Sequence, residues 1–243
     1  FNQDPEMAIT QDAADAASAE VINYAIKPAL RHAEDPKDDI IGALLEGKDT
    51  EKGLTHDEFC WFFLLLIAAG NESTRTITSH GMRKLLEHPD QLEYLVENPD
   101  KIPTAVEEML RYNTAFILMR RQVVEDTEVG GIQMKKGDKI ILHYHTVNHD
   151  ESIFGEDAME FDVRRAERMP DLYNQHRSFG IGQHFCLGSH LARLELRVIF
   201  EEVIPRMRKP KLAGEIRYTR SNLVNGIKTM PITFEPEAKE AAA

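Results

Sequence analysis

The sequence predicts a mainly α-helical fold with small β-sheets. One stretch, from residue 55 to residue 88, is long enough as a helix to cross a whole domain, roughly 50 Å at 1.5 Å per residue. Short alternating segments with glycine turns lie between residues 123 and 144. A single cysteine, Cys186, lies in a glycine-rich loop directly before another stretch with helical spacing. We therefore expect one helical core with strands in short pairs.

Capping residues and prolines place the helices along the chain. Thr55 and Glu58 form a capping box, in which each side chain satisfies a free N–H group at the helix start. The run 59–69 after it is apolar on all sides, which predicts that this helix passes through the middle of the protein. Further helices are expected from an Ala-rich segment to about residue 32, over 40–45, over 91–96 and over 104–113.

Turn residues place the strands. Gly130-Gly131 and Lys136-Gly137-Asp138 are turn signals, and residues 139–144 alternate as a strand does. Near the end of the chain, Asn225-Gly226 predicts a two-residue hairpin turn between residues 223–224 and Ile227.

Composition favours an acidic intracellular protein. Lys plus Arg is 29 and Asp plus Glu is 41, so the formal net charge is −12, which argues against nucleic acid as the main partner. The two cysteines imply no disulfide framework, and a cytoplasmic location is the simplest expectation. No membrane segment is visible, because the longest apolar run has 11 residues, too few to span a bilayer.

Cys186 is the strongest candidate for chemistry. Glycines at 180, 182 and 188 let the loop fold tightly and bring the sulfur close to a flat ligand. A cysteine just before a helix amino terminus favours the thiolate, which is the form that binds metal. Two other interpretations stay open: a small buried apolar residue, or half of a zinc site with His184.

The loop as a whole resembles the haem-binding loop of the cytochrome P450 superfamily. The matching positions are Phe179, Gly180, Gly182, His184, Cys186 and Gly188. The resemblance implies haem b with Cys186 as the iron ligand and Phe179 covering the sulfur side. It also implies that Arg121, five residues before Asp126, and His184 bind the haem propionates, with Arg120 as the fallback for Arg121.

The middle of the long helix carries a second similarity. Ala68-Ala69-Gly70-Asn71-Glu72-Ser73-Thr74 interrupts its apolar stripe with small and polar residues. By itself this run fits a helix kink. Beside the cysteine loop it resembles the superfamily's oxygen-activating helix, although Ser73 stands where a threonine is usual. The resemblance implies catalytic roles in proton delivery for Glu72, Ser73 and Thr74, and contact of Ala69 with haem.

A third similarity is structural. Glu108 and Arg111 lie one helical turn apart, as an ordinary exposed ion pair often does. Their place in the chain resembles the superfamily's Glu-x-x-Arg pair, and Arg165 in the segment Phe161-x-x-x-Arg165 matches its third partner. The resemblance implies a buried Glu108–Arg111–Arg165 cluster that fixes the fold around the haem.

The expected function is that of a monooxygenase. The resemblance implies insertion of one oxygen atom of O2 into an aliphatic C–H bond of a hydrophobic substrate, and residues 221–228 look most like bacterial members that oxidise sterol side chains, branched lipids or terpenoids. Ala68, Phe116, Ile117 and Val224 are candidate lining residues. A peroxide-using haem-thiolate enzyme, a haem-binding sensor or electron carrier, and an inactive fragment without haem remain alternatives.

Electrons are expected from a ferredoxin and its NAD(P)H-dependent reductase, because the chain carries no flavin or dinucleotide fingerprint. Basic residues after Cys186 form either a docking face or ordinary solvated charges: Arg193, Arg197, Arg206, Arg208 and Lys209. Residues 1–243 are expected to be the C-terminal part of a single cytochrome P450 domain, with the N-terminal part absent.

Overall fold

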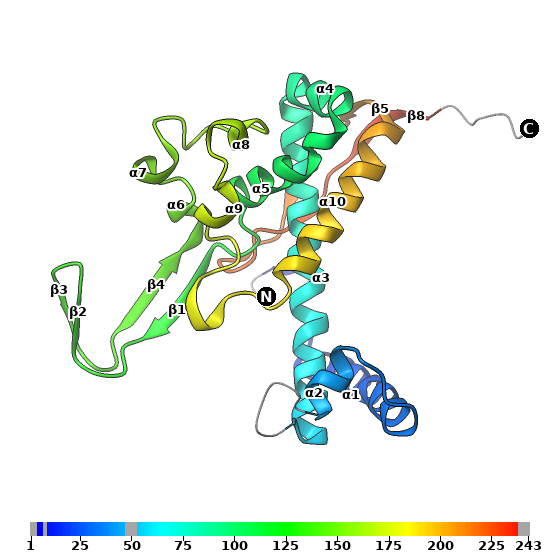
Figure 1. The fold of residues 1–243 in the computed structure, drawn as a ribbon, viewed down its shortest axis with the longest axis vertical. Helices are drawn as coiled ribbons and strands as arrows, with labels where there is room; N and C mark the ends of the chain where they lie inside the picture. Colours follow the sequence, from blue (N-terminus) through cyan, green and yellow to red (C-terminus); the bar gives the residue numbers. More distant parts are fainter. Residues whose placement is uncertain (1–3, 7–8, 47–52, 238–243) are drawn as a thin grey trace, which may run out of the picture. The chain divides into compact units, whose positions relative to one another are not determined.

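The computed structural model describes residues 4–6, 9–46 and 53–237, and its secondary structure is mostly helical (Figure 1). The chain divides into two compact units, Asn2–Asn71 and Glu72–Ala243, which are described separately below. Within the part of the chain that the structure describes, no helix has the length and apolar composition that a membrane crossing needs.

The unit of residues 2–71 is built from three helical segments. They are α1 (Gln11–Glu34), α2 (Ile40–Glu46) and the first part of α3 (His56–Glu87). Ala25 and Ala29 of α1 pack with Phe59 and Cys60 of α3 in a small buried cluster. Pro28 lies inside α1.

Helix α3 begins with the expected capping box. The Thr55 N–H donates to Glu58 Oε2 at 2.8 Å, and the Glu58 N–H donates to Thr55 Oγ1 at 3.3 Å. The prediction that the apolar run after it is buried is wrong for several residues, because Trp61 is 63% exposed and Leu65 58% exposed. The first unit buries one side of this run and leaves other large side chains at the surface.

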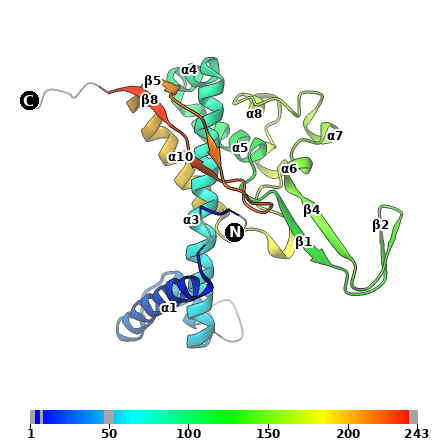
Figure 2. The same cartoon turned by 180° about the vertical axis from the view of Figure 1, so that it is seen from behind.

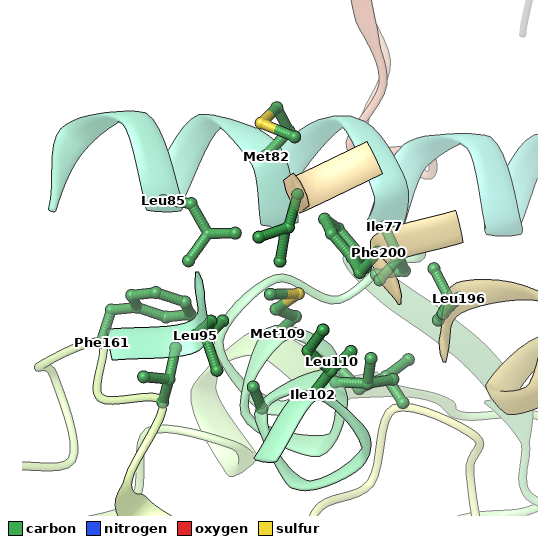
Figure 3. Packing of buried hydrophobic residues seen from close by; sticks show 14 of the residues in the cluster. Ile77, Met82, Leu85, Leu95, Ile102, Met109, Leu110, Phe161, Leu196 and Phe200 are labelled. Carbon is green, nitrogen blue, oxygen red and sulfur yellow. The ribbon is translucent and has the colours of Figure 1, made fainter. Parts of the chain in front are cut away.

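The unit of residues 72–243 holds the main core. Its helices include α4 (Pro89–Glu97), α5 (Ile102–Tyr112) and α10 (Ser189–Arg206), with the 3-10 helix η1 (Pro99–Lys101) between α4 and α5. Leu85 of α3, Leu95 of α4, Met109 of α5 and Phe200 of α10 are almost wholly buried in one cluster (Figure 3). Burial of each such side chain stabilises the fold by about 1.5–3 kcal/mol.

Close helix contact in this core requires a glycine on α3. A Cβ built on Gly81 would lie 2.7 Å from Cζ of Phe200 and 2.8 Å from Sδ of Met109. Only hydrogen fits at this position, so α5 and α10 approach α3 more closely than a larger residue would permit.

The strands form four separate antiparallel pairs, as predicted for small sheets. The pair β1 (Leu118–Gln122) with β4 (Lys139–His143) makes a ribbon, and β2 (Thr127–Val129) with β3 (Ile132–Met134) continues beyond its far end (Figures 1 and 2). Gly130 and Gly131 turn the β2–β3 hairpin with positive φ, as their positions indicated. The other pairs are β5 (Met207–Leu212) with β8 (Ile232–Pro236), and β6 (Arg217–Tyr218) with β7 (Ile227–Thr229).

Short helical turns link the ribbon to α10. They are α6 (Tyr144–Val147), α7 (Glu151–Phe154), α8 (Arg165–Arg168), α9 (Leu172–Gln175) and the 3-10 helix η2 (Gly182–His184).

The predicted two-residue hairpin at Asn225-Gly226 is wrong. Strands β6 and β7 are instead joined by a wider loop of residues 219–226, which we call the β6–β7 loop. The backbone of Leu223 and Asn225 bonds to the connection between α5 and β1, more than a hundred residues earlier, rather than across a local turn. The φ angle of Gly226 is not positive, whereas a two-residue hairpin turn of this type needs a positive φ there. Long-range pairing has therefore overridden the local turn preference.

Candidate functional site

The cysteine loop, residues 178–188, is a tight turn closed by its own backbone. Gly180 and Gly182 have φ of +74° and +68°, values that favour glycine. The Cys186 N–H donates to the Phe179 carbonyl at 2.9 Å, and the Phe185 N–H donates to the Gly182 carbonyl at 3.0 Å. Helix α10 then begins at Ser189, so Cys186 lies just before a helix amino terminus, where partial positive charge favours an anion.

The residues present fit a large flat ligand that a cysteine sulfur binds. Cys186 is exposed, whereas the other cysteine, Cys60, is buried. Ile181, Phe185 and Leu187 of the loop are 66%, 49% and 68% exposed, so the loop presents apolar side chains at the surface. Gly188 has an ordinary negative φ, and a Cβ built on it would meet no other part of the chain within 4 Å.

The zinc interpretation finds no support in the geometry. Among residues 4–6, 9–46 and 53–237, no group of three or more His, Cys, Asp or Glu side chains is arranged to hold a metal ion. His184 is exposed at the end of η2, two residues before Cys186.

One stem of the cysteine loop is attached to Asn148. The Asn148 side chain accepts a hydrogen bond from the Arg177 N–H at 2.7 Å and donates to Ser178 Oγ at 2.9 Å. Ser178 Oγ donates in turn to the Leu110 carbonyl of α5 at 2.6 Å. Asn148 is completely buried, so these bonds fix the loop entry to the core.

Glu107 of α5 connects both stems of the loop. Its carboxylate accepts from His176 Nε2 at 2.9 Å and from Arg193 Nε at 2.8 Å. Burial raises the pKa of Glu107, but the hydrogen bonds from His176 and Arg193 outweigh it and lower the pKa below its ordinary value. The Arg193 guanidinium also stacks on the rings of Tyr173 and Phe179, at 3.7 and 4.5 Å from their centroids.

Glu108, the next residue of α5, forms a second buried ionic cluster. Arg111 Nε donates to its carboxylate at 2.7 Å, and Arg165 Nε donates at 3.1 Å. All three side chains are at most 1% exposed. Arg111 also donates to the carbonyls of Asn148 and Ala158 at 2.7 and 2.8 Å. The structure thus brings together the three residues of this predicted cluster and ties the connection between β4 and α9 to α5.

The polar residues predicted on α3 lie where the second unit begins. Arg75 donates to the Glu72 carboxylate with two hydrogen bonds of 2.7 Å from one nitrogen, and Thr76 Oγ1 approaches Glu72 at 3.4 Å. Ser73 and Thr74 follow Glu72 and are half-buried. Ala68 and Ala69 are exposed and belong to the other unit.

The predicted substrate-lining residues of the second unit form one strip. Phe116 and Val224 make a β-bridge, and Val224 is 2% exposed. Two backbone bonds flank the bridge: the Ile117 N–H donates to the Leu223 carbonyl at 2.9 Å, and the Asn225 N–H donates to the Ala115 carbonyl at 2.9 Å. Residues 115–117 and the β6–β7 loop are therefore held together, and Val224 is buried where they meet.

Arg121, the predicted propionate-binding residue, lies on β1. It is exposed, and its guanidinium donates to the neighbouring Arg120 carbonyl at 3.0 Å. Arg120 and Arg121 are consecutive strand residues, so their side chains leave opposite faces of the ribbon. Only one of them can share a face with a given ligand.

The predicted basic docking face needs correction. Arg193 is 11% exposed and is engaged by Glu107, so it is wrong as an exposed docking charge. Other members are paired with acids of the same surface: Arg197 with Glu201, Arg206 with Glu202, and Lys209 with Glu235. Such pairing favours ordinary solvated charges over a strongly positive face.

Sequence reasoning missed three buried polar residues that hold the loop. Glu107, Asn148 and His176 have no local pattern that distinguishes them from surface residues. The one available signal is that Glu107 shares a short helix with apolar residues and lies next to Glu108, which does match a motif. Their partners lie 29 to 86 residues away, so spacing along the chain could not reveal them.

The fold defines the class of protein as a cytochrome P450-type haem protein. The crystal structure of CYP109E1 from Bacillus megaterium in complex with testosterone superposes with a TM-score of 0.83 at 32% identity, covering 91% of this chain and 60% of that one. The sequence model of the family described as Cytochrome P450 matches residues 9–209. The chain belongs to the cytochrome P450 family, and membership implies a haem-iron cofactor.

Two curated relatives are similar to this chain over most of its length. A steroid C26-monooxygenase from Rhodococcus jostii (strain RHA1) is 38% identical over 234 residues, 96% of this chain and 47% of the relative. A methyl-branched lipid omega-hydroxylase from Mycobacterium bovis (strain ATCC BAA-935 / AF2122/97) is 37% identical over 233 residues, 95% of this chain and 53% of the relative. The chain thus spans about half the length of the curated relatives it matches.

Proposed function

We propose that the whole protein is a haem-thiolate monooxygenase that inserts one oxygen atom of O2 into an aliphatic C–H bond of a hydrophobic substrate such as a sterol, branched lipid or terpenoid. Residues 1–243 are proposed to supply its C-terminal part. The single observation that carries the proposal is the exposed Cys186 in a tight glycine loop directly before α10. The similarity to steroid and branched-lipid monooxygenases supports the reaction class and the substrate class.

Cys186 would hold the iron of haem b, with Arg121 and His184 as the proposed propionate-binding residues, and Phe179, Gly180, Gly188 and Ala69 as further haem contacts. When bound, the haem supplies the activation of O2. The chain's own part begins with Cys186, whose position before a helix amino terminus favours the anionic sulfur that binds iron. Glu107 supports this arrangement, because it fixes the segments on both sides of the loop.

Proton supply is proposed for Glu72, Ser73 and Thr74 of α3. Glu72 accepts hydrogen bonds from Arg75, so its carboxylate is held in place on the helix. A carboxylate and hydroxyl groups on one helical turn can pass a proton between them at hydrogen-bond distance. Substrate binding is proposed for Phe116, Ile117 and Val224, whose apolar side chains fit a hydrophobic substrate.

An external electron donor completes the proposal. We propose a ferredoxin with its NAD(P)H-dependent reductase as the partner and the cytoplasm as the location. Because Arg193 is engaged by Glu107, the donor's docking site would lie on residues other than the face predicted from the sequence.

The test is the difference spectrum of the reduced protein with carbon monoxide after haem supply. We expect a band at the position diagnostic for cysteine-ligated haem, its loss in Cys186→Ser, and its retention in Cys60→Ser, because Cys60 is buried in the other unit. A normal band in Cys186→Ser would refute Cys186 as the ligand. Turnover with peroxide but none with a ferredoxin would replace the monooxygenase by a peroxide-using enzyme.

A further inference from the structure

Helix α3 carries a buried polar face directed at the C-terminal part of the second unit. Glu72, Thr76 and His80 recur every fourth residue and therefore share one side of the helix. Thr76 and His80 are 1% and 2% exposed. Buried polar atoms need hydrogen-bond partners. Thr76 Oγ1 has one on the same helix, Glu72 at 3.4 Å, whereas the partner of His80 comes from outside α3.

His80 has one such partner, and the chemistry fixes its tautomer. Nε2 of His80 lies 2.6 Å from the carbonyl oxygen of Asn225, 145 residues later. A carbonyl oxygen can only accept, so Nε2 carries the proton and donates. Nδ1 is buried and has no hydrogen-bond partner among the residues that the structure describes, so a second proton there would place an unpaired charge in the core. His80 is therefore a neutral Nε2–H donor, and the ring of Tyr218 stacks beside it with centroids 6.2 Å apart.

Asn225, the residue bonded by His80, lies next to a proposed substrate-lining residue. Asn225 is adjacent to Val224, and its own N–H donates to the Ala115 carbonyl at 2.9 Å. His80 thus bonds to one side of a backbone unit whose other side is paired with the connection between α5 and β1. A shift of Asn225 would move Val224 relative to its bridge partner Phe116.

The same loop also lies close to α3 at Glu72, one of the proposed proton-delivery residues. A Cβ built on Gly226 would lie 2.8 Å from Thr219 Oγ1 and 3.3 Å from Glu72 Oε1. The β6–β7 loop therefore approaches α3 at two successive positions, Asn225 at His80 and Gly226 at Glu72.

We propose that His80 is a positioning residue that sets the β6–β7 loop on α3 and thereby the place of Val224 in the substrate pocket. This inference rests on the proposed function for the pocket itself. The occupant is a hydrophobic substrate whose fit depends on the separation of Val224 and Phe116, and His80 acts on it through Asn225 without touching it.

The test compares His80→Leu with His80→Gln. Leucine has a similar size but no hydrogen-bond donor, whereas the glutamine amide can donate to the Asn225 carbonyl. The first readout is amide hydrogen exchange at Ile117 and Asn225, which needs neither haem nor substrate. We expect exchange at both amides to rise at least about tenfold in His80→Leu and to stay within about threefold of wild type in His80→Gln.

Two controls separate a local effect from a folding defect. Amides of α10 around Phe200 are expected to keep their protection in both variants, and Ser79→Ala, on the same helix, is expected to behave as wild type. If His80→Leu left exchange at Ile117 and Asn225 within about twofold of wild type, the inference would be overturned. If His80→Leu lost protection throughout the protein, His80→Gln would decide the question. Loss of protection at Ile117 and Asn225 in His80→Gln, with α10 still protected, would also overturn the inference.

The second readout is binding of testosterone to the haem-loaded protein, followed by its spectral shift. We expect the dissociation constant to rise about tenfold or more in His80→Leu and to recover in His80→Gln. Faster exchange with unchanged testosterone affinity would show a purely structural contact and reject the positioning role. A wild-type protein that fails to bind testosterone would count against the proposed substrate class, while the exchange comparison would still decide whether His80 holds the loop.

Discussion

Two buried histidines, His80 and His149, make the stability of the protein depend on pH. The pKa of His80 is lowered to about 4, mainly by burial and also by the nearby Arg83 and Lys84, while the hydrogen bond to Asn225 and the charge of Glu87 act in the opposite direction. Burial also lowers the pKa of His149 to about 4, although its Nδ1 bonds to the His145 carbonyl at 2.8 Å. Both rings are therefore neutral in the folded protein at pH 7, and folding excludes their protons.

The sign of the pH dependence follows directly. An unfolded histidine takes up a proton near pH ~6.5, whereas these two resist it until about pH 4, so the unfolded state binds more protons between these values. We expect the free energy of unfolding to fall as pH drops from about 6.5 to 4, by up to about 1.4 kcal/mol per pH unit for each histidine. Urea unfolding across this range measures it, and His80→Gln should show a shallower slope. Equal slopes for the variant and wild type would contradict the assignment to His80.

Residues that match a family pattern could be predicted, and residues defined only by distant partners could not. The Glu108 cluster was found because its neighbours in sequence match a motif, and the role of Cys186 stays a prediction from the same kind of match. His80 gave no signal, because its partner Asn225 is 145 residues away and only the carbonyl of that residue is used. Any amino acid supplies a carbonyl, so no side-chain pattern marks such a contact.

At the scale of elements, the packing of α3 depends on which glycine is changed. A Cβ built on Gly81 would lie less than 3 Å from side-chain atoms of Phe200 and Met109. A Cβ built on Gly70 of the same helix would meet nothing within 4 Å. We expect Gly81→Ala to lower the free energy of unfolding by about 1–3 kcal/mol through overpacking. Gly70→Ala should raise it by up to about 1 kcal/mol through helix propensity. Chemical denaturation of both variants tests this, and a stabilising Gly81→Ala would show that the helices can separate without loss.

Elements with local determinants were predicted well. The long helix was expected over residues 55–88 and is observed as His56–Glu87, because its capping box acts within four residues. The β2–β3 hairpin also follows from its own glycines. The turn at Asn225-Gly226 failed because residues 115–117 compete for the same backbone groups. The prediction that the whole apolar run of α3 is buried failed for a related reason, because an apolar run does not specify which other part of the protein covers it.

At the scale of the second unit, α5 is the common support of the cysteine loop and the fold around it. Glu107 and Glu108 are consecutive and differ by about 100° in direction around the helix, so each serves a different set of partners. Glu107 engages segments on both sides of the loop, and Glu108 engages Arg165. Four cations or potential cations are thereby gathered around two adjacent carboxylates: Arg111, Arg165, His176 and Arg193.

Removal of the shared acid should be severe. Glu108→Gln would leave Arg111 buried without a counter-charge and Arg165 with only the half-exposed Asp157, and we expect it to lower the free energy of unfolding by about 3–5 kcal/mol. Glu125→Gln, at an exposed position, should change it by less than about 0.5 kcal/mol. Thermal or urea unfolding of the two variants gives the comparison. Similar stabilities for both would mean that the cluster contributes no more than a surface charge.

The bond between His80 and Asn225 also has a consequence during protein synthesis. Chains emerge from the ribosome at about 5–20 residues per second, so roughly 7–30 seconds separate the two residues in a nascent chain. For that interval the polar face of α3 is made but its partner is not. His80 has no access to the Asn225 carbonyl in that interval, and the β6–β7 loop can close on α3 only after residues 219–226 have been translated.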